Sequence, residues 1–111
     1  MIRETKYRAW DRVRLTWVYF YMLDGQQPVP LYDGNFLWKD LDPWQQFTGR
    51  KDFNGKDIFE GDILKAHGRD ADPAVVTWNE KLMQWDARIS LWAFHEPVVI
   101  GSLNETPELL K

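Results

Sequence analysis

The chain has 111 residues and a formal net charge of −3, so it is long enough to bury a core but lacks the overall positive charge typical of dedicated nucleic-acid binders. It contains no cysteine, which excludes disulfides, thiolate metal sites and cysteine nucleophiles. Length and composition therefore predict one domain, residues 1–111, that folds without covalent cross-links.

Positive charge is concentrated near the N-terminus. In residues 1–20 five basic residues stand against two acidic ones, which gives a local charge of +3. The basic residues are Arg3, Lys6, Arg8, Arg12 and Arg14. Partial alternation over residues 5–10 is typical of a half-buried strand, and we interpret the charges as protecting its exposed edge. The alternative is a phosphate-binding stripe, but alternation along strands would send the cations to different faces.

The next segment, residues 16–23, is rich in aromatic and β-branched residues and predicts a buried strand that ends at Asp24-Gly25. Residues 15–23 are far shorter than the roughly 20 residues of a membrane helix. No apolar stretch of the secretory type follows Met1. We therefore expect a soluble, cytoplasmic protein with no membrane partner.

Residues 31–47 predict a short hairpin around residues 33–35, followed by one helical turn within residues 40–47. Asp42 would be its N-cap and Pro43 its first helical residue. The chain contains seven tryptophans, more than a small domain buries completely, and we expect about two of them at the surface. Trp38 and Trp44 are the candidates for an interface, because proline, glycine and acidic residues surround them.

Residues 46–64 contain three glycine turn signals between short apolar segments. Asn54-Gly55 predicts a type I′ turn that pairs residues 51–53 with residues 56–58. Gly61 predicts a bulge or a positive-φ bend between two strands. The flanking Glu60 and Asp62 suit hydrogen bonds to backbone amides better than acid–base chemistry. These five residues form the predicted structural corner.

The remaining segments predict strands and one final turn. Residues 66–73 are the best loop, residues 74–88 a hairpin, and residues 89–94 and 98–100 the last strands. Thr106 and Pro107 suit the N-cap and the first position of a single terminal helical turn. Leu109 and Leu110 would pin this turn to the fold.

Three of these segments resemble the YopX family, small proteins encoded by phages and prophages. Residues 46–64 resemble its central motif, residues 3–11 its N-terminal strand and residues 99–110 its C-terminal segment. The resemblance implies an all-β fold built around a small SH3-like barrel, with additional hairpins and a short C-terminal helical turn. It also implies a phage or prophage protein in the host cell, and no known activity, cofactor or catalytic residue.

The sequence offers little catalytic chemistry. Residues 52–60 are rich in acids, but their glycine comes at the fourth position, whereas a calcium loop of the EF-hand type needs it at the sixth. His67, Asp70 and Asp72 suit a solvated loop better than a metal site, and His95 beside Glu96 suits a structural histidine. Neither serine lies in a nucleophile-elbow motif. We predict no enzyme activity, no cofactor and no metal.

Two function classes follow. The first is a phage or prophage accessory protein that contacts another protein through Trp38 and Trp44, either in self-assembly or with a host factor. The second is a small-barrel nucleic-acid binder that uses the five N-terminal cations, with stacking from Tyr7 or Trp10. The net charge favours protein contact.

Overall fold

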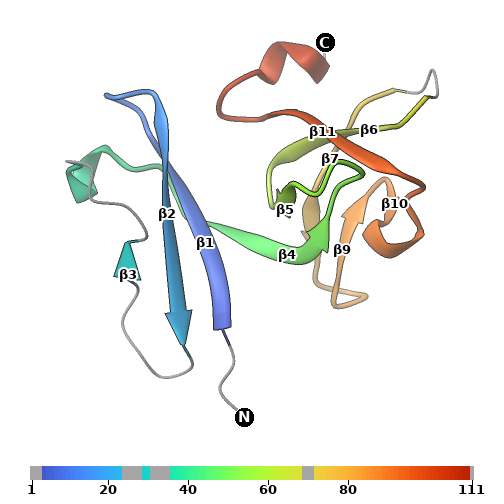
Figure 1. Cartoon of the computed structure of the whole chain (residues 1–111), viewed down its shortest axis with the longest axis horizontal. Coiled ribbons are helices and arrows are strands. Elements are labelled where there is room, and N and C mark those ends of the chain that lie inside the picture. The colour runs from blue at the N-terminus through green and yellow to red at the C-terminus, as the bar shows by residue number, and fades with distance from the viewer. Residues whose placement is uncertain (1–3, 24–28, 31–35, 69–71, 111) are drawn as a thin grey trace. The chain divides into compact units, whose positions relative to one another are not determined.

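A computed structural model describes residues 4–23, 29–30, 36–68 and 72–110 (Figure 1). The chain forms two compact units, Met1–Phe47 and Thr48–Lys111. The described elements are strands and short 3₁₀ helices, so the prediction of a mostly β fold is confirmed. That the whole chain behaves as one domain stays a prediction.

The first unit is an antiparallel sheet. The strands β1 (Glu4–Asp11) and β2 (Thr16–Leu23) pair along their whole length, and β3 (Val29–Pro30) pairs with β2 at Phe20 and Tyr21. On the other side of β1 lie Gln45 and Gln46, the first residues of β4 (Gln45–Lys51). The 3₁₀ helix η1 (Trp38–Asp40) comes between β3 and β4. The order in this unit is therefore β3-β2-β1-β4.

Side chains of β1 and β2 alternate between two faces of the sheet, and one of these faces holds the core of the unit. Tyr7 lies opposite Phe20 and Ala9 opposite Val18, so these four residues share one face. Ala9, Val18 and Phe20 are fully buried and form the core of this unit, and Tyr7, Phe36 and Leu41 pack against them. The opposite face carries Arg8, Trp10 and Trp17.

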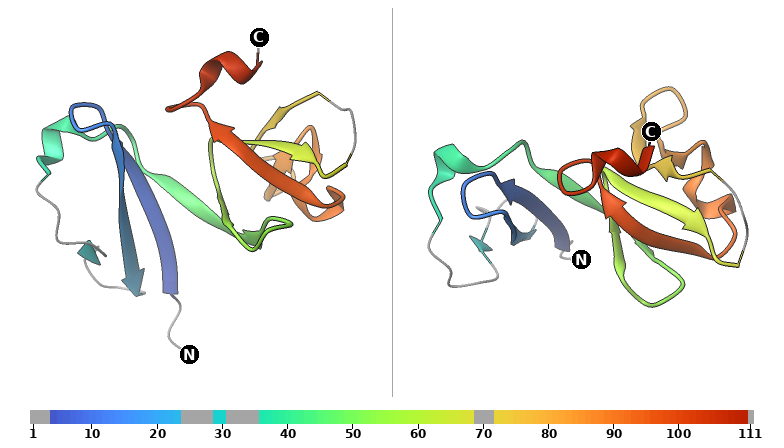
Figure 2. Two further views of the ribbon diagram at one scale, coloured as in Figure 1. Left: turned by 45° about the horizontal axis from the view of Figure 1, so that its top comes forward. Right: turned by 90° about the horizontal axis from the view of Figure 1, so that it is seen from above.

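The second unit contains the remaining strands and two 3₁₀ helices. These are β5 (Asp57–Phe59), β6 (Asp62–Ala66), β7 (Ala74–Val75), β8 (Thr77–Asn79), β9 (Gln84–Ala87), β10 (Ile89–Ser90), η2 (Leu91–Ala93), β11 (Pro97–Ser102) and η3 (Pro107–Leu110). One antiparallel sheet has the order β11-β6-β7 and another the order β10-β9-β8. Figure 2 shows β11 running beside β6, which it pairs from Pro97 to Ser102.

A separate core fills the second unit. Its buried members are Ile58, Leu64, Ala74, Val76, Trp85, Ala87 and Leu91. Burial alternates along β9, because Trp85 and Ala87 face this core whereas Gln84 and Asp86 are only half-buried. In the described ranges the strand pairing does not close into a barrel, so the SH3-like barrel stays a prediction.

The corner at Gly61 is confirmed. Its φ is +84°, which glycine adopts without the steric cost that a Cβ brings. The Gly61 amide donates to the carbonyl oxygen of Val76 (2.9 Å), and its carbonyl accepts from the amide of Leu103 (2.9 Å). The Asp62 carboxylate is buried and accepts a hydrogen bond from the amide of Phe59 (2.8 Å), the role expected for an acid at this bend. Glu60 is half-buried.

The hairpin at residues 51–58 exists, but its turn type and register were wrong. The amide of Gly55 donates to the carbonyl oxygen of Asp52 and the amide of Asp52 to that of Lys56, so the loop has three residues, 53–55. Gly55 alone in this loop has a positive φ (+85°), whereas a type I′ turn needs one at Asn54 as well. The physical reason lies in Asp52, whose carboxylate accepts from the amides of Asn54 and Lys56 and favours the longer loop.

The helical turn expected in residues 40–47 was also wrong. The turn lies earlier, at η1, and Gln45 begins a strand because its backbone pairs with β1. Most of the hairpin expected around residues 33–35 lies outside the described residues. The C-terminal turn is confirmed as η3, which packs on β11 so closely that a Cβ on Gly101 would overlap Thr106 and lie 2.8 Å from Leu109 Cδ1.

We expect Gly61→Val to destabilise the fold by about 1–3 kcal/mol, because a β-branched residue resists a φ of +84°. Urea unfolding measures the effect. The comparison is Gly68→Val, where a φ of +70° brings similar strain in an exposed loop. Its loss should be smaller, because that loop can relax whereas two backbone hydrogen bonds hold Gly61 in place. Equal stability of Gly61→Val and the wild type would contradict the strain argument.

Candidate interaction surface

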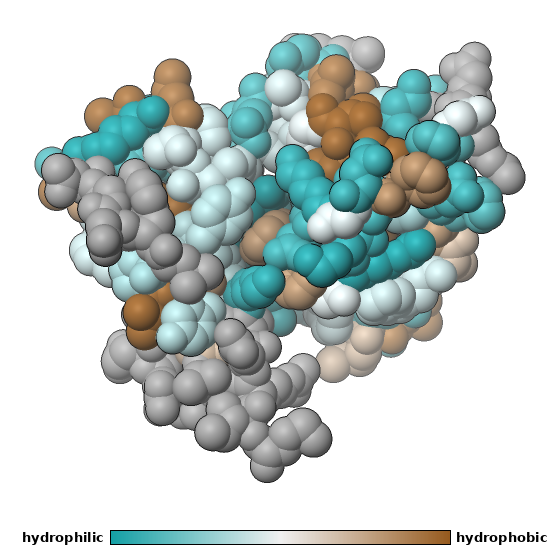
Figure 3. Space-filling model, in the orientation of Figure 1, coloured by the Kyte–Doolittle hydropathy of each residue, from teal (hydrophilic) through white to brown (hydrophobic). Residues whose placement is uncertain are grey.

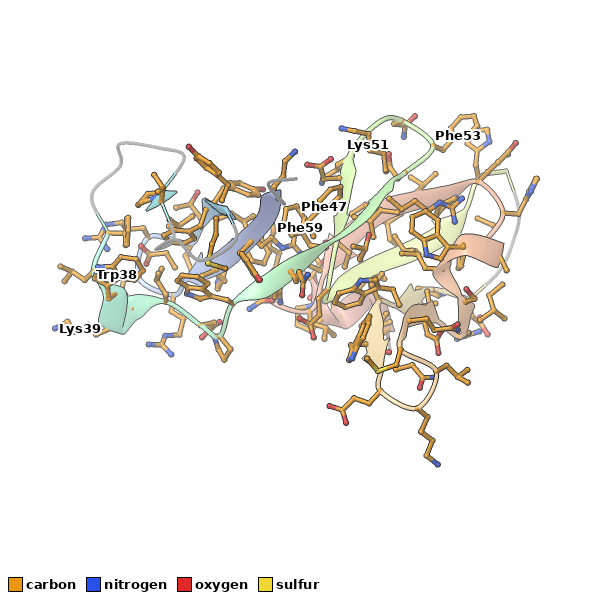
Figure 4. All side chains as sticks on the ribbon, turned by 90° about the horizontal axis from the view of Figure 1, so that it is seen from below. Trp38, Lys39, Phe47, Lys51, Phe53 and Phe59 are labelled. Atoms are coloured by element: carbon orange, nitrogen blue, oxygen red, sulfur yellow. The ribbon has the colours of Figure 1, made fainter. Side chains whose placement is uncertain are left out.

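Trp38 and Trp44 lie against a buried phenylalanine in the first unit. The Phe20 ring is stacked with Trp44 at 4.8 Å between ring centroids and with Trp38 at 5.5 Å. The two indoles are 6.3 Å apart and within 26° of parallel. We call Phe20, Trp38 and Trp44 the tryptophan platform; Figure 4 shows Trp38 on η1.

The platform combines one buried ring with two partly exposed ones. Phe20 is fully buried, whereas Trp38 is 59% exposed and Trp44 36% exposed, as expected for these two tryptophans. Tyr7 contacts Trp44 at 5.8 Å, and Phe36 meets Trp38 edge-on at 5.1 Å. The neighbouring Leu37 is 49% exposed. Exposed aromatic side chains that neighbouring rings hold in place are typical of binding hot spots.

Backbone hydrogen bonds fix the segment that carries Trp38. The amide of Arg12, in the β1–β2 turn, donates to the carbonyl oxygen of Asp40 (3.0 Å). The amide of Asp42 donates to the carbonyl oxygen of Trp10 (2.9 Å), and Asp11 forms a β-bridge with Leu41. These bonds join residues 40–42 to the β1–β2 turn and so set the place of η1.

Two arginines reinforce this junction. Arg12 pairs with Asp42 (Nη1 to Oδ1, 3.2 Å) and donates to the carbonyl oxygen of Lys39 (2.7 Å). Arg14 reaches Asp40 (3.4 Å) and Asp11 (3.2 Å). We call Arg12 and Arg14 the arginine clamp. Exposed ion pairs contribute only about 0–1 kcal/mol each, so the clamp supports a position that the backbone bonds establish.

Asp11 organises the turn that holds the clamp. Its carboxylate is buried and accepts hydrogen bonds from the amides of Val13 (3.0 Å) and Arg14 (2.9 Å). The hydrogen bond from the Arg14 amide is the main reason that the pKa of Asp11 is lowered, and the Arg14 guanidinium adds to the effect. The turn therefore depends on an ionised carboxylate.

The structure disperses the predicted cationic stripe. Arg8 is only 3% exposed, lies 3.8 Å from the centre of the Trp17 ring and donates to Gln45 (2.8 Å). Lys6 lies over the Phe47 ring at 5.3 Å, and Arg12 and Arg14 hold carboxylates. Lys6 and Arg8 share a face of β1, contrary to the expectation that alternation would separate them, because both have even positions. Arg3 lies outside the described residues.

Comparison with known families identifies the chain. The family model described as YopX protein matches residues 6–111, which span both units. The chain belongs to the YopX family. The predicted resemblance to the YopX family is thereby confirmed, and the match includes residues 46–64 and 99–110 and, from residue 6 onwards, the segment 3–11.

One solved structure shows the same fold as this YopX-family chain. It is protein EF1440 from Enterococcus faecalis, which is 20% identical, with a TM-score of 0.59 over 96% of this chain and 98% of that one. At this identity the likeness shows the fold alone. The comparison with curated proteins gave no match.

Two further tryptophans of the YopX-family chain are exposed, and the expectation of about two surface tryptophans was therefore too low. Trp92, on η2, is 61% exposed with the Arg50 guanidinium 5.9 Å from its ring centre, and Trp78 is 39% exposed. Local composition gave no sign of Trp92, which lies between Leu91 and Ala93, whereas the polar neighbours of Trp78, Thr77 and Asn79, were a signal that sequence reasoning missed. Apolar side chains also gather at the end of the β1–β2 hairpin (Figure 3), where Val13 and Leu15 are 66% and 69% exposed.

The histidines of the second unit lie beside one acid. Glu96 is 3.6 Å from His67 and 3.7 Å from His95, all three are partly exposed, and the His67 ring stacks on Phe53 at 4.1 Å. No group of three metal-ligating side chains occurs in residues 4–23, 29–30, 36–68 and 72–110. Asp70 is not among these residues. In the same ranges, no helix has the length and apolar character needed to cross a membrane.

Sequence reasoning missed Asp52 as a structural residue. Besides the loop amides, its carboxylate accepts from the amide of Val99 (3.0 Å), and it is 8% exposed. It thus ties the hairpin at residues 51–58 to β11. An acid two residues before Asn-Gly signals a side-chain-capped turn, and this signal was available in the sequence.

We expect Asp11→Asn to lower stability at pH 7 and to lose this effect in acid. The folded-state pKa is below the ordinary value of about 3.9, so the carboxylate stabilises the fold above that pH, and the contribution disappears as pH falls through the folded pKa. Denaturant unfolding of both proteins from pH 7 to pH 2 measures this convergence. If the free energies of unfolding of the two proteins differ by the same amount over that whole range, the ionised form of Asp11 does not stabilise the fold.

Proposed function

We propose that this YopX-family chain is a phage or prophage accessory protein that acts in the host cytoplasm by binding another protein through its tryptophan platform. The observation that carries the proposal is the stack of two exposed indoles on buried Phe20, held to the β1–β2 turn by backbone bonds. The expected SH3-like barrel would lie in the second unit, and the proposal does not depend on it.

Rigidity supports this role. Exposed aromatic side chains bind well when their rotamers are fixed beforehand, because little entropy is then lost on association. Trp38 is fixed by Phe20 on one side and Phe36 at its edge, and η1 is bonded to residues 10–12. Most of its area still faces water, which leaves that area free for a partner.

Nucleic-acid binding is the weaker alternative. Specific sites on DNA involve several phosphate contacts, and each neutralised phosphate steepens the salt dependence by about 0.9 in log–log slope. Of the five candidate cations, Arg8 is buried, Arg12 and Arg14 are paired with carboxylates, and Arg3 is outside the described residues. Three of the cations that this alternative needs, Arg8, Arg12 and Arg14, therefore make contacts within the fold instead.

We expect Trp38→Ala to abolish capture of the partner from host or lysogenic cells when the tagged chain is used as bait. Capture by the wild type should survive about 0.5 M salt, because apolar burial is little screened whereas phosphate attraction is strongly screened. The matched control is Trp92→Ala, which removes an equally exposed tryptophan of the second unit and should leave capture intact.

Binding of the purified chain to random-sequence DNA or RNA is measured alongside. We expect none in the submicromolar range at physiological salt. Submicromolar binding that Lys6→Glu abolishes and Trp38→Ala leaves untouched would sink the proposal and favour the nucleic-acid alternative. Arg8→Glu is unsuitable as the test variant, because burying an acid against Trp17 would unfold the sheet.

A further inference from the structure

The size of the tryptophan platform limits what it can bind. A tryptophan side chain offers at most about 250 Å², so the exposed fractions of Trp38 and Trp44 leave about 240 Å² of indole surface. A stable protein–protein interface needs about 800 Å² from each partner. Two copies of this chain that met only through their platforms would fall well short of that area. The platform is the size of a site for a few residues of peptide.

Charge restricts the ligand further. Residues 1–47 contain six basic and six acidic residues, a net charge of zero, whereas residues 48–111 contain eight and eleven, a net charge of −3. Close to the platform, Asp40 and Asp42 are already paired with Arg14 and Arg12. The exposed Lys39, which follows Trp38 in η1, adds one positive charge. A surface with so little net charge neither attracts nor repels a charged segment strongly, so it fits a ligand whose contacts are apolar.

The geometry of the rings favours an extended ligand. The two indoles are within 26° of parallel, with 6.3 Å between their centroids, and both rest on the same phenylalanine ring. Their exposed parts are therefore apolar ring surface close together on one support. A polyproline II segment suits such surface, because its rings stack on aromatic faces and its backbone is already extended, so that little entropy is lost on binding.

We propose that the tryptophan platform binds a short, uncharged, proline-containing segment of its partner in extended conformation. This rests on the proposed function and specifies the partner chemistry at the same site. Trp38 and Trp44 supply the stacking surfaces, and Phe20 and Phe36 keep the Trp38 ring in place.

The test is a titration of the ¹⁵N-labelled chain with two capped ten-residue peptides, decaproline and an alternating alanine–proline peptide. A glycine–serine peptide of the same length is the control ligand. Indole N–H signals are assigned with single Trp→Phe variants. We expect the signals of Trp38 and Trp44 to shift with at least one proline peptide, with a Kd below about 1 mM, and the signal of Trp92 to stay unchanged.

Matched variants locate the site. Trp38→Ala should weaken peptide binding at least about tenfold, and Trp92→Ala should leave it unchanged. The remaining indole signals report whether each variant is folded, and Trp44→Phe is a milder second variant with a smaller expected loss.

Absence of shifts with both proline peptides, or equal shifts with the glycine–serine peptide, would overturn this inference. The proposed function would survive that result if the bait still captured a partner in a Trp38-dependent manner. If sedimentation shows self-association that Trp38→Ala abolishes, a second copy is the occupant and the proline assignment is wrong. Titration with single-stranded oligothymidylate tests whether the indoles stack on bases instead. Trp38-dependent binding of that strand without peptide binding would contradict both proposals.

Discussion

The carboxylate of Asp11 is the point on which the first unit depends. It is buried at the end of β1, and two amides of the following turn donate to it. Because those amides are fixed, the turn directs Arg12 and Arg14 towards residues 39–42, and the Arg12 amide towards Asp40. Ionised Asp11 therefore helps to determine the position of Trp38, because it holds the turn that binds residues 40–42.

The same device recurs in the second unit. Asp52 and Asp62 are buried acids whose oxygens accept from backbone amides, and each holds a turn beside a glycine of positive φ. A carboxylate that accepts such bonds satisfies donors that a tight turn would otherwise leave buried without a partner. Asp52 and Asp62 therefore hold backbone turns, and this role accounts for the acid that begins residues 52–60.

Local signals in the sequence were enough for part of this account. Gly61 between two apolar strands predicted its bend, because only glycine adopts that φ at low cost, and polar neighbours predicted the exposure of Trp38 and Trp44. Features that depend on distant contacts were not predictable. The burial of Arg8 follows from Trp17 and Gln45, and the exposure of Trp92 follows from η2, which turns Leu91 rather than Trp92 into the core.

The register of the hairpin at residues 51–58 shows the same limit. Asn-Gly alone favours a two-residue turn, yet in the three-residue loop the Asp52 carboxylate accepts hydrogen bonds from the amides of Asn54 and Lys56. It accepts a third from the amide of Val99 on β11. The loop length of this hairpin therefore goes together with a hydrogen bond between residues 47 positions apart, although it was predicted from local residues alone. The contacts of Arg8, Arg12 and Arg14 were unpredictable for a related reason, since each has a partner among residues 39–45, far away in the sequence.

The central claim is that the β1–β2 turn, organised by the Asp11 carboxylate, holds the tryptophan segment in place through backbone hydrogen bonds. The most direct measurement is the set of nuclear Overhauser contacts between the Trp38 and Phe20 rings in the variant Asp11→Ala, which removes the acceptor of the turn amides. We expect these contacts to weaken and the amide signals of residues 38–42 to shift, while signals of residues 48–110 keep their positions. Unchanged Trp38–Phe20 contacts in that variant would contradict the claim, because the turn would then have no part in presenting the platform.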